Sequence, residues 1–296
     1  TGELLNESVV SLQDIVDKYV DGHTKMSSYI SVARNFLKVH YDEHALREND
    51  RVPTHGVQFG LRKELDDKNS AQRSEHCQQC AFIPFLFKEL RQFVPDDDED
   101  AQRLLVDVEE KFAIYQAHRL RVINQQAHIA AATERLKKDC DDGKPTTEAI
   151  LLQDFKTKIE EKSARETTKE HYATRGMSWH GIMLQYFVKE NITVKEGRKL
   201  VNKVVTSRKL VYLDQIIAHG NNQSSATVMA CMEAAVNWIS VNLPFINKLT
   251  VQSDNAKCYN NNELRMFIML LNTFSPVKIV RYIFTETQDG KGSFLL

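Results

Sequence analysis

The segment Lys248–Tyr259 changes character abruptly, and this change constrains the fold more than any other feature of the chain. The run Leu-Thr-Val-Gln at 249–252 suits a short buried strand. It is followed at once by Ser253, Asp254 and Asn255. A carboxylate at the C-terminal end of a buried strand stands where open α/β sheets place their chemistry. The alternative interpretation is that Asp254 caps the next turn or helix, as Asp and Asn often do.

The segments around this stretch alternate between strand-like and helix-like patterns. Strands are predicted at 149–157, 177–188, 210–217, 248–253 and 277–285, and helices at 224–240 and 262–273. The basic segment 189–209 is predicted to be partly helical. Three consecutive strands form an antiparallel meander, and a strand–helix–strand crossover then returns parallel and right-handed. We therefore expect an α/β fold with a ribonuclease H-like mixed five-stranded sheet and helices, preceded by a mostly helical N-terminal region.

In such a sheet, two aspartates face one another at the active edge. Asp154 lies near the end of the first strand, as Asp254 does in the fourth. Two carboxylates at that separation repel unless a divalent cation lies between them, and hard oxygen ligands suit Mg²⁺ or Mn²⁺. Two such ions activate the attacking oxygen and stabilise the leaving oxygen in phosphodiester chemistry. The pattern thus predicts a two-metal site at Asp154 and Asp254.

The N-terminal half is predicted to be helical and to divide at an acidic run. Apolar residues recur at helical spacing within 8–39 and again from 101 to about 138. The acidic run 96–100 marks a boundary, because such runs form solvated linkers or helix N-termini. We expect a helical module at 1–95, an acidic linker and long helix at 96–145, and a ribonuclease H-like core, truncated at its C-terminus, at 146–296.

A Cys-x-x-Cys pair within the first module is a candidate metal site. Cys77 and Cys80 supply two thiolates, and zinc needs two further nitrogen or sulfur ligands. His76 adjoins the pair, and His55 lies upstream of it. The pattern is half of a zinc signature, so two interpretations stay open: a structural zinc site, or reduced cysteines that serve as small core residues.

Composition and charge narrow the class of protein. Charged residues make up 27% and hydrophobic residues 42% of the 296-residue chain, as in ordinary globular proteins. No apolar run approaches the roughly 18 residues that span a bilayer, and no signal peptide stands at the start. Five cysteines with one close pair do not form a disulfide framework. We expect an intracellular protein, with no membrane partner, that is a fragment because it begins at Thr1.

Five short motifs follow one another between residues 149 and 292. They are Gln153-Asp-Phe-Lys156, Arg175-Gly-Met-Ser-Trp-His-Gly181, Leu213-Asp-Gln-Ile216, Gln252-Ser-Asp-Asn-Ala-Lys-Cys-Tyr259 and Thr285-Glu-Thr-Gln-Asp-Gly-Lys-Gly292. In this order they resemble a group of eukaryotic, transposon-derived proteins related to DDE transposases. The resemblance implies a nuclear, transposase-like protein that binds DNA at transposon ends or a target. It also implies that Asp154 and Asp254 are the first and second catalytic acids of phosphodiester cleavage and strand transfer.

The third acid of such a site is where this chain departs from the group. Relatives continue past the Gly-Lys-Gly motif into an Asp-Ala-His-Phe-like segment and a further helix, on which the third acid usually lies. Here only Ser-Phe-Leu-Leu follows Gly292. The third acid is therefore either missing or supplied by Glu286 or Asp289, and Glu286 is our candidate.

Basic connections are the candidate nucleic-acid contacts. Segments 156–175 and 189–209 are expected to flank the active edge, where cations attract phosphates; a solvated charged face is the alternative. The candidates in the first segment are Lys156, Lys158, Lys162, Arg165, Lys169 and Arg175. Asp214 is expected to be structural. Trp179 and His180 could approach a nucleic-acid strand, but aromatic side chains in a strand more often belong to the core, which is the interpretation we favour.

Other functions stay open beside the transposase-like one. One is a domesticated, catalytically inactive protein that binds nucleic acid or another partner. Another is a ribonuclease H-like nuclease acting on RNA or structured DNA. The sequence does not separate DNA from RNA and does not fix the oligomeric state.

Overall fold

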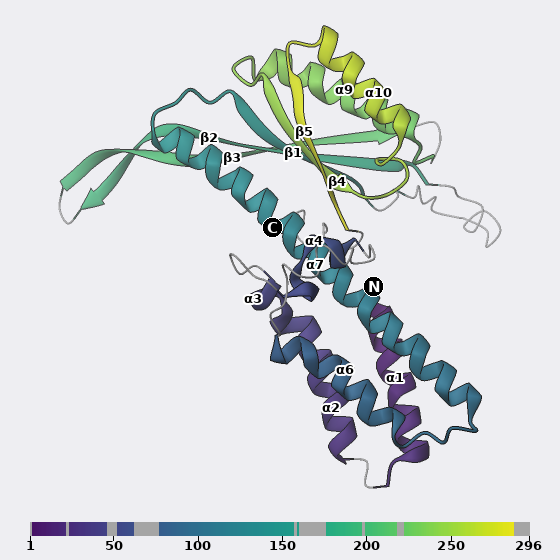
Figure 1. Cartoon of the computed structure of the whole chain (residues 1–296). Coiled ribbons are helices and arrows are strands. Elements are labelled where there is room, and N and C mark those ends of the chain that lie inside the picture. Colours follow the sequence, from purple (N-terminus) through teal and green to yellow (C-terminus); the bar gives the residue numbers. More distant parts are fainter. Residues whose placement is uncertain are drawn as a thin grey trace, which may run out of the picture. The chain divides into compact units, whose positions relative to one another are not determined.

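The computed structural model describes residues 2–21, 24–45, 52–61, 77–156, 159, 176–196, 199–217 and 222–286. The chain divides into two compact units, Thr1–Asn124 and Gln125–Leu296. The first unit is helical and the second contains a sheet (Figure 1). The boundary falls inside the long helix α7, Glu99–Asp141, which contributes residues to both units. A mixed α/β protein with a mostly helical N-terminal part is thus confirmed.

The first unit is built from short helices around one apolar core. Those before α7 are α1 (Gly2–Tyr19), α2 (Thr24–Asn35), the π-helical turn η1 (Phe36–His40), α3 (Tyr41–Ala45), the 3-10 turn η2 (Pro53–His55), α4 (Val57–Gly60) and α6 (Gln78–Arg91). Leu12, Ile30, Leu86 and Phe112 come from four different helices, and each is at most 1% exposed. Apolar residues three and four apart share one helix face, and this spacing aims them at a common core.

The acidic run 96–100 forms the N-terminus of α7. The Asp98 carboxylate accepts hydrogen bonds from the backbone N–H of Ala101 (3.0 Å), the ammonium of Lys18 (3.2 Å) and the hydroxyl of Tyr19. These contacts lower the pKa of Asp98 to about 2, and the hydrogen bond from Tyr19 contributes most. Acidic side chains at this position also compensate the positive end of the helix dipole. Of the two interpretations of the run, the helix N-terminus is confirmed.

The second unit contains a mixed sheet of five strands. They are β1 (Glu148–Phe155), β2 (Ser178–Glu196), β3 (Lys199–Ile217), β4 (Lys248–Asp254) and β5 (Lys278–Thr285), in the spatial order β3-β2-β1-β4-β5. The pairs β1–β2 and β2–β3 are antiparallel, and the pairs β1–β4 and β4–β5 are parallel. The meander and the parallel return predicted from the sequence are therefore both present.

The prediction that 189–209 is partly helical was wrong. This segment continues β2 and β3 as one hairpin, in which pairing runs from Ser178↔Ile217 to Glu196↔Lys199. The physical reason is its content of β-branched residues, such as Ile192, Thr193 and Val204, which favour extended backbone.

Both faces of the central strands are covered. Helices α9 (Ser225–Asn242) and α10 (Asn262–Phe274) pack on one face, where Val236 and Leu264 meet Val251 in a shared cluster. The C-terminal part of α7 packs on the other, where Leu136 contacts the cluster of Ile150 (Figure 1). Because both faces are buried, β1 is a nearly continuous apolar run rather than an alternating one.

The two covering helices begin with side-chain caps. The Ser224 hydroxyl accepts from the N–H of Thr227 (3.2 Å), and the Asn261 amide oxygen accepts from the N–H of Leu264 (2.8 Å). These bonds satisfy donors that the first helical turn leaves without intrahelical partners. Neither helix is a membrane span: over the part of the chain that the structure describes, no helix combines the length and the apolar character that crossing a bilayer requires.

Candidate cation site at the carboxyl ends of the central strands

The register of β1 and β4 brings Asp154 and Asp254 side by side. The two strands pair in parallel from Glu148↔Lys248 to Leu152↔Gln252. Each aspartate lies two residues beyond the last of these pairs, at the carboxyl end of its strand. Side chains two apart in a strand share a face, so both aspartates lie on the face of Leu152 and Gln252.

Neighbouring titratable groups report the charge of both aspartates. Burial raises the pKa of the Cys258 thiol to about 11, and the negative charges of Asp254 and Asp154 add to this shift. Burial, followed by the charge of Asp154, also raises the pKa of Tyr259. Both aspartates therefore act on the pKa values of the same pair of residues after β4.

Asp254 also caps the turn that follows its strand. Its Oδ1 atom accepts a hydrogen bond from the backbone N–H of Ala256 at 3.1 Å. The turn-capping interpretation is therefore confirmed, but it does not exclude the other one. A carboxylate offers about four acceptor positions on two oxygens, and one backbone bond uses one of them.

A cavity of about 280 Å³ opens on the same face of the sheet as the two aspartates. Its lining includes Leu152 and Gln252, which precede the aspartates by two residues, and Ile129 and Thr133 of α7. Arg208 also lines it and donates to the amide oxygen of Gln185 at 2.7 Å. The cavity is thus lined by apolar, amide, hydroxyl and guanidinium groups, and neither aspartate is among its lining residues.

Lys156, one of the predicted nucleic-acid contacts, makes an ion pair within the sheet. Its ammonium lies 2.9 Å from Asp214 and 4.4 Å from the ring centre of Trp179. It reaches them across Gly181, the residue paired with both Asp154 and Asp214. Hydrogen bonds lower the pKa of Asp214; the larger contribution comes from Lys156 and the smaller one from Trp179. Asp214 therefore has the structural contacts expected of it.

His180 belongs to the core, as predicted. It is 0% exposed, and its Nδ1 atom lies 2.8 Å from the amide oxygen of Gln215. Its ring packs against Phe155, with centroids 5.0 Å apart, and lies 6.1 Å from the ring of Tyr259. Burial lowers the pKa of His180 to about 4, so the imidazole is neutral near pH 7.

Glu286, the candidate third acid, follows β5 directly. Thr285 pairs with Asp254, so Glu286 lies one residue past the level of the second aspartate. Its backbone N–H donates to the side-chain oxygen of Gln125 at 2.8 Å. Its role as third acid stays a prediction, and Asp289 lies outside the described residues.

The basic segments do not both flank this edge. Ile150 pairs with Gln185, and β2 continues from there past the amino end of β1. Lys189 to Lys209 therefore lie at the opposite end of the sheet from Asp154, and that prediction was wrong. The cause is the length of the hairpin, which carries the segment away from the site. Five of the six candidates in the first segment lie outside the described residues: Lys158, Lys162, Arg165, Lys169 and Arg175.

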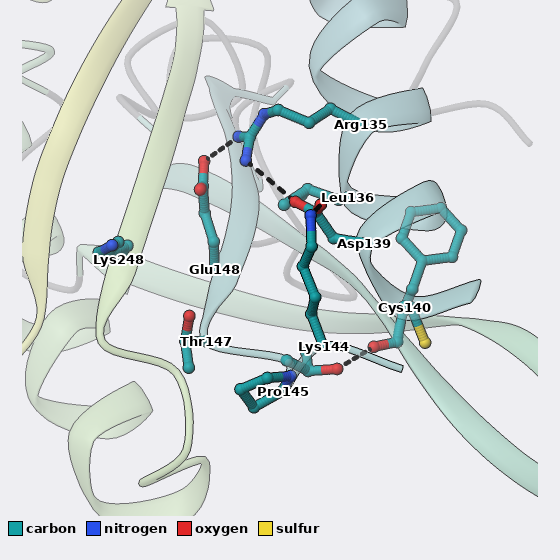
Figure 2. A pocket seen from close by; sticks show the side chains of 11 residues that line it. Arg135, Leu136, Asp139, Cys140, Lys144, Pro145, Thr147, Glu148 and Lys248 are labelled. Carbon is teal, nitrogen blue, oxygen red and sulfur yellow. Dashed lines mark hydrogen bonds and ion pairs between the residues drawn. The ribbon is translucent and has the colours of Figure 1, made fainter. Parts of the chain in front are cut away.

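The sequence did not reveal a second cavity, of about 290 Å³, where α7 ends and β1 begins (Figure 2). Here Arg135 makes ion pairs with Glu148 (2.6 Å) and Asp139 (3.6 Å), and Lys144 pairs with Asp139. The hydrogen bond between Arg135 and Glu148 is the main reason why the pKa of Arg135 is raised. The hydrogen bond between Lys144 and Asp139 is the main reason why the pKa of Asp139 is lowered. Cations and acids are matched, so the network joins α7 to β1.

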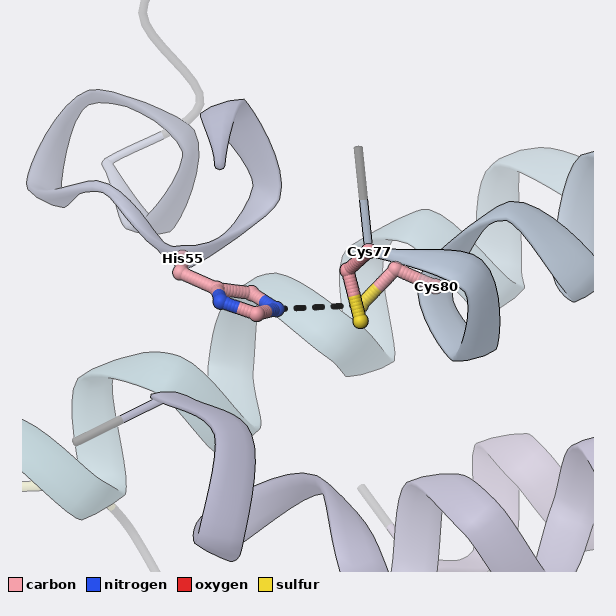
Figure 3. Close-up of side chains that lie close together, drawn as sticks. All are labelled: His55, Cys77 and Cys80. Atoms are coloured by element: carbon pink, nitrogen blue, oxygen red, sulfur yellow. Dashed lines mark hydrogen bonds between the residues drawn. The ribbon is translucent and has the colours of Figure 1, made fainter. Parts of the chain in front are cut away.

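Three of the four predicted zinc ligands come together in the first unit. His55, Cys77 and Cys80 each offer a ligand atom, and these atoms all lie within 4.8 Å of one another (Figure 3). His76 lies outside the described residues. This cluster and the aspartate pair belong to different units.

No family model, curated protein or solved structure matches this chain.

Proposed function

We propose that this chain is a transposase-like, DNA-binding protein. Its second unit acts as a ribonuclease H-like core, with Asp154 and Asp254 holding Mg²⁺ or Mn²⁺ for phosphodiester cleavage and strand transfer. One observation carries the proposal. The parallel register of β1 and β4 aligns these two aspartates at the carboxyl ends of the central strands, on one face.

Topology supports the proposal. A ribonuclease H-like sheet has an antiparallel meander of three strands, followed by two strands that run parallel to the first. The order β3-β2-β1-β4-β5 and its pairing directions agree with that arrangement. Ligands of open α/β sheets bind beyond the carboxyl ends of strands, which is where both aspartates lie.

The motif around the second aspartate supports it as well. Asp254 accepts from Ala256, and the amide of Asn260 donates to the side-chain oxygen of Asn255 at 2.6 Å. Tyr259 is 1% exposed and anchors the turn in the core. Together, these contacts of Gln252–Tyr259 fix the position of Asp254 at the end of the strand.

The donor set fits a hard divalent cation. Two adjacent carboxylates repel, and they raise the pKa of both Cys258 and Tyr259 beyond the effect of burial. A cation bound by carboxylate oxygens relieves that repulsion, and Mg²⁺ and Mn²⁺ prefer such ligands. When bound, the ions would supply Lewis-acid stabilisation of the phosphoryl oxygens. Glu286 is the third acid in this proposal. It follows Thr285, which pairs with Asp254 and shares its face, so the chain must turn after β5 for the Glu286 carboxylate to reach the two aspartates.

Nucleic acid would reach the site beside the connection between β1 and β2. This connection leaves the sheet at Lys156, whose N–H donates to the carbonyl of Trp179 at 2.7 Å. It returns through Met177, which bridges Ile159. Both of its ends are therefore at the edge that carries Asp154. Its cations Lys158, Lys162, Arg165, Lys169 and Arg175 would contact phosphates, with affinity that falls as salt rises.

The decisive experiment compares cation binding and cleavage in matched variants of the full chain. Mn²⁺ binding is measured by calorimetry, and cleavage of labelled DNA and RNA is measured with Mg²⁺ or Mn²⁺. Asp154→Asn and Asp254→Asn should each weaken Mn²⁺ binding at least ten-fold and reduce cleavage to background, and Glu286→Gln should reduce cleavage. Asp107→Asn is the control, because Asp107 lies on α7 in the first unit and pairs with Lys111.

The outcomes separate the competing functions. Cleavage that survives both aspartate substitutions would refute the proposed site. Mn²⁺ binding and salt-dependent DNA binding without cleavage would favour the domesticated, inactive protein. Preferential cleavage of RNA would favour the nuclease alternative.

A further inference from the structure

The first unit contains a cluster of soft metal ligands that the phosphodiester site does not use. The His55 Nε2 atom lies 3.1 Å from the Sγ atom of Cys80, and the ligand atoms of His55, Cys77 and Cys80 lie within 4.8 Å of one another (Figure 3). His55 is 8% exposed and Cys80 6% exposed. An imidazole nitrogen and two sulfur atoms at these separations are a set of ligands that a soft or borderline metal ion can bind.

Local structure explains why these residues converge. Cys77 occupies the N-cap position of α6, but its side chain makes no capping hydrogen bond. Cys80 lies three residues on, so both thiols emerge at the first turn of the helix. His55 ends the turn η2, and its ring lies edge-on to Tyr41, whose hydroxyl donates to the carbonyl of Thr54 at 2.7 Å. These contacts help to fix the position of the imidazole.

A contact from α7 completes the surroundings. The amide of Gln116 donates to the Sγ atom of Cys80 at 3.5 Å. Ligands of structural metals commonly receive such hydrogen bonds from neighbouring groups, which orient them. The cluster thus joins η2, α6 and α7, three elements that are distant in sequence.

We propose that His55, Cys77 and Cys80 bind one zinc ion, which fastens η2 to the start of α6. Two thiolates and an imidazole are soft or borderline ligands, which suit Zn²⁺ and not Mg²⁺. Two thiolates also neutralise the charge of a dication, so the buried site carries no net charge. Zinc ligands in tetrahedral geometry lie roughly 3.5–3.8 Å apart, so only small side-chain movements are needed. His76 precedes Cys77 and lies outside the described residues.

A dithiol without metal is the competing interpretation. Cys77 and Cys80 are both reduced, and the same spacing is compatible with a disulfide or with simple core packing. Neither alternative involves His55 or Gln116. Their participation is therefore what distinguishes the zinc site.

The test measures zinc in the full chain after exhaustive dialysis into metal-free buffer, and then Co²⁺ substitution, whose absorption reports thiolate ligands. We expect about one zinc per chain. His55→Ala, Cys77→Ser and Cys80→Ser should each weaken zinc binding by more than ten-fold, and Gln116→Ala by about ten-fold. His55→Cys keeps a ligand and should retain zinc even where His55→Ala fails to fold.

Matched controls keep this test independent of the phosphodiester site. Cys140→Ser alters a cysteine of the second unit that is 5% exposed, and it should leave the zinc content unchanged. Asp154→Asn should leave it unchanged as well. A metal-free wild-type chain with unaltered helicity, or full zinc retention by the Cys77→Ser, Cys80→Ser double variant, would overturn the zinc site and leave the proposed function standing.

Discussion

The two units offer cation ligands of opposite kinds, and their folds explain why. In the helical unit, the ligands converge inside the core, where His55 and Cys80 are buried. In the sheet unit, Asp154 and Asp254 are half-buried at strand ends, next to a cavity. Soft neutralised ligands tolerate burial, whereas hard carboxylates require access to water and substrate. The comparison teaches that the first site is suited to holding structure and the second to chemistry.

The largest expected effect uses chelators to separate the two sites. A chelator selective for transition metals should remove zinc but leave Mg²⁺, because the ligand sets differ in softness. The first unit should then lose several kcal/mol of stability, since structural zinc binding contributes directly to folding. Hydrogen exchange is the measurement: protection should fall in α6 and persist in β1 and β4. Equal loss in both units would contradict the division.

In the chain stripped of zinc, acid should affect the two units in different pH ranges; with zinc bound, protonation of its ligands would add a further pH dependence to the first unit. His180 is neutral in the fold, with its pKa lowered from 6.5 to about 4 by burial. The unfolded chain therefore binds more protons between these values, so stability is complete above pH 6.5 and falls as pH drops toward 4. The loss is about 3 kcal/mol, at 1.36 kcal/mol per pKa unit. The neighbouring rings are Phe155 and Tyr259, and Tyr259 stays neutral throughout.

Asp98 provides the contrast in the first unit. Its pKa is lowered from 3.8 to about 2, so its contribution is complete above pH 3.8 and is lost as pH falls toward 2. Urea unfolding between pH 7 and pH 2, followed by probes in each unit, measures both effects. His180→Asn should flatten the dependence between pH 6.5 and 4 in the second unit alone. A variant that keeps this dependence would assign it to other groups.

Much of the second unit could be predicted from the sequence because its information is local. Short apolar runs indicated all five strands, and the order of strands and helices indicated the parallel return that aligns Asp154 with Asp254. The segment 189–209 was predicted to be partly helical, but its β-branched residues favour the hairpin that it forms. The contact of Lys156 with Asp214 joins residues 58 positions apart, and no local pattern encodes it.

The metal ligands of the first unit were less predictable, because they come from segments that are distant in the sequence. The Cys-x-x-Cys spacing identifies Cys77 and Cys80 as candidate ligands, but the sequence alone does not choose between His55 and His76 as a further ligand. Only folding brings the turn η2 against the start of α6 and selects His55 from the described histidines. The second unit has a similar case, because the charge network of Arg135 with Glu148 and Asp139 depends on where α7 ends relative to β1.

A smaller effect is expected at a helix cap. Ser224→Ala removes the acceptor for the N–H of Thr227 and should lower the free energy of unfolding of the second unit by about 1 kcal/mol. Ser224→Asp should restore most of it, because Asp caps as well as Ser. Urea unfolding measures the change. In the first unit, Cys77 stands at the N-cap without capping, so Cys77→Ser in the presence of zinc should cost more than Ser224→Ala. An effect of Cys77→Ser smaller than that of Ser224→Ala would count against its role as a ligand.

The smallest effect concerns Gly181, which lies beneath the side chain of Lys156. A Cβ atom at this position would lie 2.4 Å from the Lys156 Cε atom, so Gly181→Ala must displace the lysine from Asp214. The pair is 29% and 48% exposed at its side chains, so its loss should cost at most about 1 kcal/mol. Lys156→Ala should cost a similar amount. In the Lys156→Ala background, Gly181→Ala should cost less, because the displaced side chain is already gone. A double-mutant cycle in urea measures this coupling. Strict additivity would mean that the glycine is required for another reason, and the zinc content of the first unit should remain constant throughout.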